Sequence, residues 1–149
     1  KICSPAKSEF QKLEIIMDAG LGIIHGFASS IGGMYDIPHG VICGTLMAAS
    51  NEINVRELKK KPKNRAALKK YLLLGKLFLD EKGKGEDYYI DGFVQYLHKL
   101  TIDFQLPGLK KFGLRESNLR SICQNTEIKN NPVSLTIDNL IEILTCRLL

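Results

Sequence analysis

Apolar residues recur at steps of three and four positions along most of the chain, the spacing that places side chains on one face of a helix. The first such run follows Ser8–Gln11, whose S-x-x-Q form is that of a helix-capping box. No run alternates between apolar and polar residues as a half-buried strand does, and no internal repeat is evident. The pattern therefore predicts an all-α fold, a helical bundle.

Two further apolar runs are separated by a short break and predict a helical hairpin. The first covers residues 23–31 and ends at the glycine pair 32–33. The second follows Pro38, which suits the first turn of a helix because its missing N–H group is not needed there. We expect this hairpin to extend from about Gly20 to Ile53.

The remainder of the chain predicts shorter helices separated by glycine, proline and asparagine breaks. Thr136 is placed to cap the last of them. The expected helices cover residues 66–78, 87–100, 117–125 and 137–148, with a single helical turn at 109–112.

Composition places the chain among ordinary globular proteins. It has 149 residues, of which 44% are hydrophobic and 25% are charged, so disorder, a collagen-like fibre and a membrane protein are all disfavoured. There is neither a leader pattern nor an apolar run near the length of a membrane span. We expect residues 1–149 to form one domain that has no membrane partner.

The charge of +5 comes from 21 Lys and Arg against 16 Asp and Glu, and much of the excess lies between Arg56 and Lys70. That segment contains no aromatic residue on which a base could stack. We interpret it as a solvated loop and helix face, and we expect no nucleic-acid partner. The four cysteines are far apart and form no CxxC pair, which favours reduced thiols and a cytoplasmic location.

The chain has three histidines, and two of them fall on the predicted hairpin. His25 lies on its first arm and His39 in the first turn of its second arm, so antiparallel packing would bring the two imidazoles together. Imidazole binds iron, zinc, copper and nickel, but two ligands do not fill a metal site. From the spacing alone, a hydrogen-bonded histidine pair at a helix contact remains the alternative. We interpret His98 as a surface or boundary residue.

The hairpin also carries a specific family resemblance. Residues 20–29 (GLGIIHGFAS) and 32–41 (GGMYDIPHGV) resemble the signature of the iron-containing alcohol dehydrogenase family. The similarity continues through residues 68–75, 106–113 and 131–144, and thus covers nearly the whole chain. The resemblance is to the C-terminal helical half alone, and it implies the C-terminal domain of a two-domain enzyme with a dehydroquinate synthase-like fold.

The resemblance implies an enzyme that interconverts a small alcohol and an aldehyde or ketone with NAD or NADP. In the family, an N-terminal α/β domain carries a glycine-rich loop for the cofactor, and no such loop occurs in this chain. Cofactor binding would then lie on an absent N-terminal domain, and this chain alone would be inactive. We also expect the full-length enzyme to be a homo-oligomer.

The resemblance implies metal ligands as well. The family's metal is held by an Asp and three His, of which two match His25 and His39, so the other two would precede Lys1. The metal would be Fe(II), with Zn(II) as the alternative, acting as a Lewis acid on the alcohol oxygen. Many relatives have a further histidine four residues after the first, where this chain has Ser29. One helical turn would still point Ser29 toward the site, and it is our candidate catalytic residue.

Several alternatives remain open at this stage. A glycerol dehydrogenase or dehydroquinate synthase relative also places histidines on this hairpin, although residues 37–41 favour the alcohol dehydrogenases. A non-catalytic helical module that binds metal weakly is the alternative from another class. The glycines of the hairpin indicate either a cleft wall or simple helix packing. We expect Phe27 and Tyr35 to pack in the core or cleft, and Asp36 to be a turn residue rather than a ligand.

Overall fold

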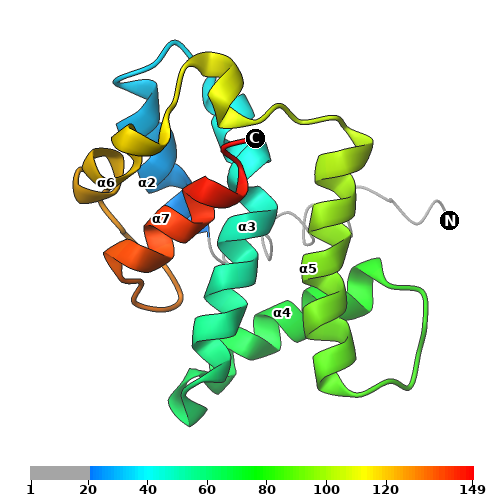
Figure 1. Cartoon of the computed structure of the whole chain (residues 1–149). Helices are drawn as coiled ribbons and strands as arrows, with labels where there is room; N and C mark the ends of the chain where they lie inside the picture. Colours follow the sequence, from blue (N-terminus) through cyan, green and yellow to red (C-terminus); the bar gives the residue numbers. More distant parts are fainter. Residues whose placement is uncertain (1–20) are drawn as a thin grey trace, which may run out of the picture.

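The structure is a computed structural model that describes residues 21–149. Within that range it contains helices and no strand, which confirms the all-α prediction (Figure 1). The predicted helix after Ser8 lies outside the described residues. The helices are α2 (Leu21–Gly32), α3 (His39–Lys59), α4 (Arg65–Phe78), α5 (Glu86–Asp103), α6 (Glu116–Gln124) and α7 (Ile137–Cys146), with 3-10 turns η1 (Pro62–Asn64) and η2 (Leu109–Phe112).

The predicted hairpin is present as α2 and α3, but its second arm is longer than predicted. Pro38 precedes α3 as its N-cap residue, and the helix runs on to Lys59 rather than ending near Ile53. The reason is packing, because Val55 and Leu58 are buried and continue the apolar face of α3 into a second core cluster. The basic segment therefore begins inside a helix.

The first core cluster lies between α2, the N-terminal part of α3, α6 and α7. Phe27 is fully buried there, as predicted, and Tyr35 packs against the cluster from its edge. Around Phe27, the hairpin also buries aliphatic side chains, among them Ile23, Ile24, Ile31, Ile42 and Leu46. Figure 1 shows α2, α6 and α7 gathered on one side of α3.

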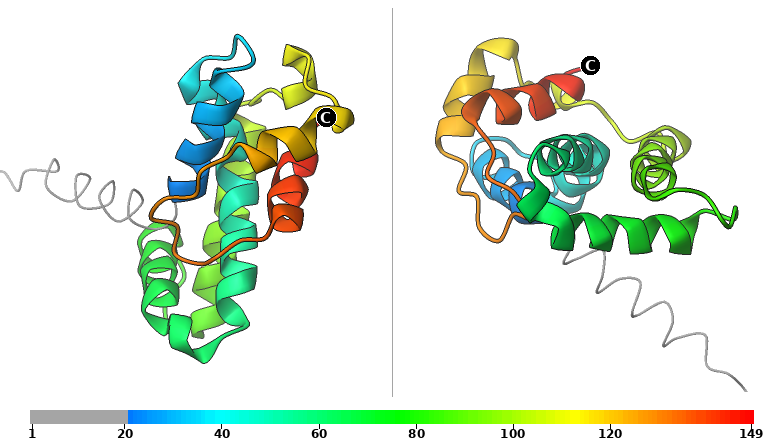
Figure 2. Two further views of the ribbon diagram at one scale, coloured as in Figure 1. Left: turned by 90° about the vertical axis from the view of Figure 1, so that its left-hand side faces the viewer. Right: turned by 90° about the horizontal axis from the view of Figure 1, so that it is seen from below.

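The second core cluster lies between α3, α4 and α5. In Figure 2, α5 runs alongside α3 and α4 crosses both at one end. Tyr71 of α4 is fully buried, and its hydroxyl donates a hydrogen bond of 2.8 Å to the Oδ1 atom of Asn51. Because α3 contributes to both clusters, it is the helix on which the other elements are assembled.

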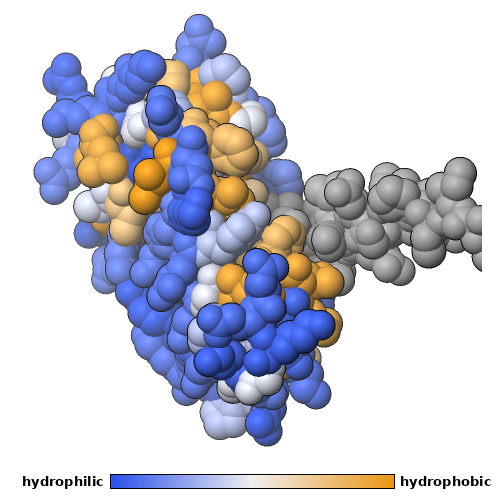
Figure 3. Space-filling model, turned by 90° about the vertical axis from the view of Figure 1, so that its right-hand side faces the viewer, coloured by the Kyte–Doolittle hydropathy of each residue, from blue (hydrophilic) through white to orange (hydrophobic). Residues whose placement is uncertain are grey.

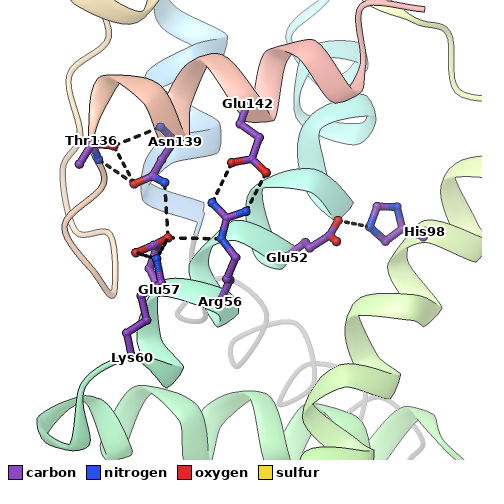
Figure 4. A network of polar contacts seen from close by, with 8 residues as sticks. All are labelled: Glu52, Arg56, Glu57, Lys60, His98, Thr136, Asn139 and Glu142. Atoms are coloured by element: carbon purple, nitrogen blue, oxygen red, sulfur yellow. Dashed lines mark hydrogen bonds and ion pairs between the residues drawn. The ribbon is translucent and has the colours of Figure 1, made fainter.

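A polar network joins α7 to α3 across the surface (Figure 4). Both terminal nitrogens of Arg56 donate to the carboxylate of Glu142 at 2.7 Å. The side chain of Thr136 accepts a hydrogen bond from the Asn139 backbone N–H, which confirms the predicted cap of the last helix. Arg56 belongs to the basic segment, so part of that charge is neutralised within the fold.

The remaining boundaries differ little from the prediction. Helix α4 ends at Phe78, as predicted, and α7 ends at Cys146 rather than at residue 148. The single turn η2 is present, and Gly113 ends it with a φ of 92°, a left-handed conformation that favours glycine. No helix in the described part of the chain is long and apolar enough to cross a membrane.

On the face of the molecule that Figure 3 shows, apolar residues gather in separate places, with hydrophilic residues between them. Ile102, Phe104 and Leu149 are the most exposed of the large hydrophobic residues, at 74%, 70% and 76%. The chain that follows Phe104 packs on the start of α3, because the side chain of Leu106 lies against Gly44. These three side chains therefore sit near the end of α3 that carries His39.

Candidate metal centre

Helix α2 presents different side chains on its different faces. Its apolar residues point into the first core cluster, whereas His25 and Ser29 are exposed. These two residues are one turn apart, so they share one face of the helix. Burial of the apolar face thus fixes the rotation of α2 and leaves His25 accessible to a ligand.

The second histidine is held by the start of the other helix. His39 is the first residue of α3 and is also exposed. Its ring stacks on that of His25, with the ring centroids 5.8 Å apart and the planes inclined by 25°. The predicted meeting of the two imidazoles is therefore present, and it is produced by the antiparallel packing of α2 and α3.

A third potential ligand lies one turn further along α3. Cys43 follows His39 by four residues and is half-buried, and burial raises the pKa of its thiol. The ligand atoms of His25, His39 and Cys43 all lie within 4.8 Å of one another. Sequence reasoning missed this cysteine. The signal that could have found it is the spacing His39-x-x-x-Cys43, which places both side chains on one face of a helix.

This donor set fits a divalent transition metal. Imidazole nitrogen and thiolate sulfur are among the ligands that such ions take from proteins, at about 2.0–2.1 Å for nitrogen and about 2.3 Å for sulfur on zinc. The three side chains come from two packed helices, so their approach does not depend on a loop. We conclude that the residues present are suited to the kind of metal that the family resemblance implies.

The segment between α6 and α7 supports α2 from behind. A Cβ atom added to Gly26 would overlap the carbonyl oxygen of Glu127, so the absence of a side chain allows this backbone to lie directly on the helix. The Ser30 and Thr126 hydroxyls are hydrogen-bonded at 2.8 Å beside it. Gly22 makes a similar contact one turn earlier. Gly22 and Gly26 therefore serve packing, against a non-helical segment rather than another helix.

Asn131 of the same segment connects both arms of the hairpin. Its Oδ1 atom accepts a hydrogen bond of 3.4 Å from the backbone N–H of Ile23 in α2. Its Nδ2 atom donates at 2.8 Å to the Oδ1 atom of Asn54, which is fully buried in α3. These bonds fix α2 relative to α3 and thus help to set the distance between the two histidines.

The other candidates from the sequence are placed as follows. His98 lies on the surface, as predicted, and its Nε2 atom is 2.8 Å from a carboxylate oxygen of Glu52 (Figure 4). Asp36 is exposed in the connection between α2 and α3. The role assigned to Ser29 stays a prediction.

Comparison with known proteins identifies the family. A sequence model of the Fe-containing alcohol dehydrogenase family, C-terminal, matches residues 15–148, which is most of the chain. The chain therefore belongs to the Fe-containing alcohol dehydrogenase family, through its C-terminal domain. Among curated proteins, it is 26% identical over 132 residues to alcohol dehydrogenase 4 of two Saccharomyces cerevisiae strains, a match that covers 85% of this chain and 31% of the relative.

Solved structures show the same fold. A 1,3-propanediol oxidoreductase superposes with a TM-score of 0.68 at 20% identity, covering 85% of this chain and 32% of that one. An alcohol dehydrogenase from Oenococcus oeni gives 0.63 at 21% identity, with coverage of 85% and 32%. The NADH-dependent butanol dehydrogenase A of Thermotoga maritima gives 0.60 at 20% identity, with coverage of 86% and 33%. This chain thus spans about a third of the length of the proteins that it matches.

Proposed function

We propose that this chain is the metal-binding catalytic domain of an NAD(P)-dependent alcohol dehydrogenase that interconverts a small alcohol and its aldehyde or ketone. One observation carries the proposal. His25 and His39, whose spacing matches that of two family ligands, lie side by side and exposed on two packed helices. Membership of the Fe-containing alcohol dehydrogenase family supports the class of reaction.

In this proposal the two histidines hold a divalent metal through their ring nitrogens, Fe(II) or alternatively Zn(II). A bound metal supplies a Lewis acid that makes an alcohol hydroxyl more acidic and polarises a carbonyl, while the nicotinamide carries the hydride. Ser29 lies one turn after His25 on the same exposed face. In this proposal its hydroxyl orients the substrate oxygen or passes a proton, at the position where many relatives have a histidine.

The rest of the enzyme would come from outside this chain. An N-terminal α/β domain would bind NAD or NADP and supply the two other ligands, and the active site would lie between the domains. Residues 1–149 are then one domain of the enzyme. We infer a cytoplasmic, homo-oligomeric enzyme, and its free cysteines Cys43, Cys123 and Cys146 are compatible with a reducing compartment.

Metal binding tests the first half of the proposal. The 149-residue chain, its His25→Ala and His39→Ala variants, and a His98→Ala control are each equilibrated with Fe(II) or Zn(II) and analysed for bound metal. We expect the wild type and the control to retain metal and each of the other variants to lose it. Unchanged metal content in the His25 or His39 variant would refute the ligand assignment.

Activity tests the second half. The 149-residue chain alone is expected not to oxidise alcohols with NAD or NADP, whereas a longer chain that includes the upstream coding sequence is expected to do so. In the longer chain, His25→Ala should abolish turnover. Ser29→Ala should lower kcat and leave the metal content close to that of the wild type. A longer chain that binds metal weakly and shows no turnover with any small alcohol would instead favour the non-catalytic module.

A further inference from the structure

We propose that the Cys43 thiol is a third metal ligand, and that the site therefore takes zinc in preference to Fe(II). The inference rests on the proposed function, because it uses the same pair of histidines. It goes further by adding a ligand that the family resemblance does not supply and by naming the class of metal. The observation that carries it is the convergence of three ligand atoms within 4.8 Å of one another.

The geometry requires only small adjustments to close around one ion. In a tetrahedral site with zinc–nitrogen bonds of about 2.0–2.1 Å and a zinc–sulfur bond of about 2.3 Å, neighbouring ligand atoms are roughly 3.3–3.6 Å apart. The three atoms here lie within 4.8 Å, so each must move by on the order of 1 Å or less. Rotation of the side chains supplies such a movement without moving a helix.

The backbone around Cys43 is held in place. His39 and Cys43 are one turn apart within α3, so their separation is set by the helix itself. The next residue, Gly44, packs against Leu106, whose Cδ1 atom would lie 3.5 Å from an added Cβ atom. Beside it, Thr45 is buried and donates a hydrogen bond of 2.7 Å to the Pro107 carbonyl oxygen. The first turns of α3 therefore form a rigid support for two of the three ligands.

The chemistry of the donors determines the preferred metal. Within residues 21–149, the grouped ligands are two imidazoles and a thiol, with no carboxylate among them. Such a site binds Co(II) and Zn(II) more tightly than Fe(II). A soft thiolate ligand increases the preference for zinc. In this chain by itself, three ligands leave the fourth position of a tetrahedral ion open, so a ligand from an N-terminal domain can also reach the metal.

Cobalt absorption spectroscopy on the 149-residue chain tests the inference directly, because a thiolate bound to Co(II) gives a near-ultraviolet charge-transfer band that imidazole does not give. The wild type should develop this band, and zinc should abolish it by displacing cobalt. Cys43→Ser should lack the band, whereas Cys146→Ala, which removes an exposed cysteine outside the site, should retain it. Far-ultraviolet circular dichroism confirms that each variant is folded.

Affinity provides the second readout. Loss of a residue that only supports a ligand lowers metal affinity about 10–100-fold, so loss of the Cys43 ligand should weaken zinc binding at least as much. Anaerobic competition between zinc and Fe(II) should show a strong preference for zinc in the wild type and a smaller preference in Cys43→Ser. The His25→Ala variant should lose cobalt altogether.

The outcomes separate this inference from the proposed function. If cobalt binding depends on His25 and His39 but the wild type gives no charge-transfer band, Cys43 is not a ligand. The assignment of the two histidines is then unaffected. The Cys43 assignment is equally overturned if Cys43→Ser keeps the wild-type zinc affinity and selectivity. If neither histidine variant changes metal binding, both the proposed metal centre and this inference are wrong.

Discussion

Replacement of Gly26 by alanine should loosen the support of α2 beside the candidate metal centre. The added Cβ atom would overlap the Glu127 carbonyl oxygen and lie 3.0 Å from the Cγ2 atom of Thr126. The overlapping atom belongs to the backbone, so no flexible side chain can move aside. The segment that contains Thr126 must therefore move away from α2, and the hydrogen bond between the Ser30 and Thr126 hydroxyls is lost.

The expected change in stability combines two destabilising contributions with one stabilising contribution. Overpacking of a close contact costs about 1–3 kcal/mol. A lost hydrogen bond between partly buried groups adds about 1 kcal/mol. In the opposite direction, alanine is favoured over glycine inside a helix by about 1 kcal/mol. We expect Gly26→Ala to lower the free energy of unfolding by about 2 kcal/mol, which for a chain of this length lowers Tm by about 4–8 °C.

Urea denaturation of the metal-free chain measures this difference, with Gly40→Ala as the matched control. Gly40 is also in a helix of the hairpin, but an added Cβ atom there meets no atom of the described residues within 4 Å. The control should therefore equal the wild type in stability or exceed it by at most about 1 kcal/mol. If Gly26→Ala proves as stable as Gly40→Ala, the segment does not press on α2, and the reasoning is wrong.

Three further predictions concern stability and are measured by chemical denaturation. Thr136→Ala removes the side chain that caps α7 and should lower the free energy of unfolding by about 1 kcal/mol, whereas Thr136→Ser should restore most of the loss. The hydrogen bond from Arg56 lowers the pKa of Glu142, so this pair stabilises the fold above the ordinary Glu pKa of about 4.3, and the contribution is lost as the pH falls through the lowered value. Glu142→Gln should accordingly show a smaller loss of stability between pH 7 and about pH 3 than the wild type, and an identical loss would exclude the pair as a contributor. Ser50 is fully buried, and among residues 21–149 its hydroxyl has no hydrogen-bond partner, so Ser50→Ala should raise the free energy of unfolding by about 1 kcal/mol. A clear loss of stability in Ser50→Ala would mean that the hydroxyl is bonded in solution.

The helices could be predicted because their signals are local. The apolar periodicity, the glycine pair after Ile31 and the proline before His39 all act within a turn or two of the backbone. The cap at Thr136 has the same local character and was predicted correctly. The end of α3 could not be predicted in this way, because Leu58 continues the helix by packing against α4 and α5, which follow it in the chain.

The glycines show the same difference between what local signals predict and what tertiary packing decides. From the sequence alone, Gly26 can indicate that another segment lies close to the helix, but it does not indicate which segment. The partner is the segment around Glu127, about a hundred positions further along the chain, and only the assembled fold brings it onto α2. The bonds of Asn131 to both arms of the hairpin are equally invisible in the sequence, because amide side chains form hydrogen bonds wherever the fold places a partner.

For the candidate site, the sequence by itself determined the family, the hairpin and the choice of His25 and His39. These follow from short motifs, in which residue type and spacing are sufficient. Only the tertiary structure decided that the two rings stack at a centroid distance of 5.8 Å and that Cys43 joins them. The physical reason is that a ligand set is defined by distances of a few ångströms between side chains, and such distances are fixed by how α2 packs on α3 rather than by either helix alone.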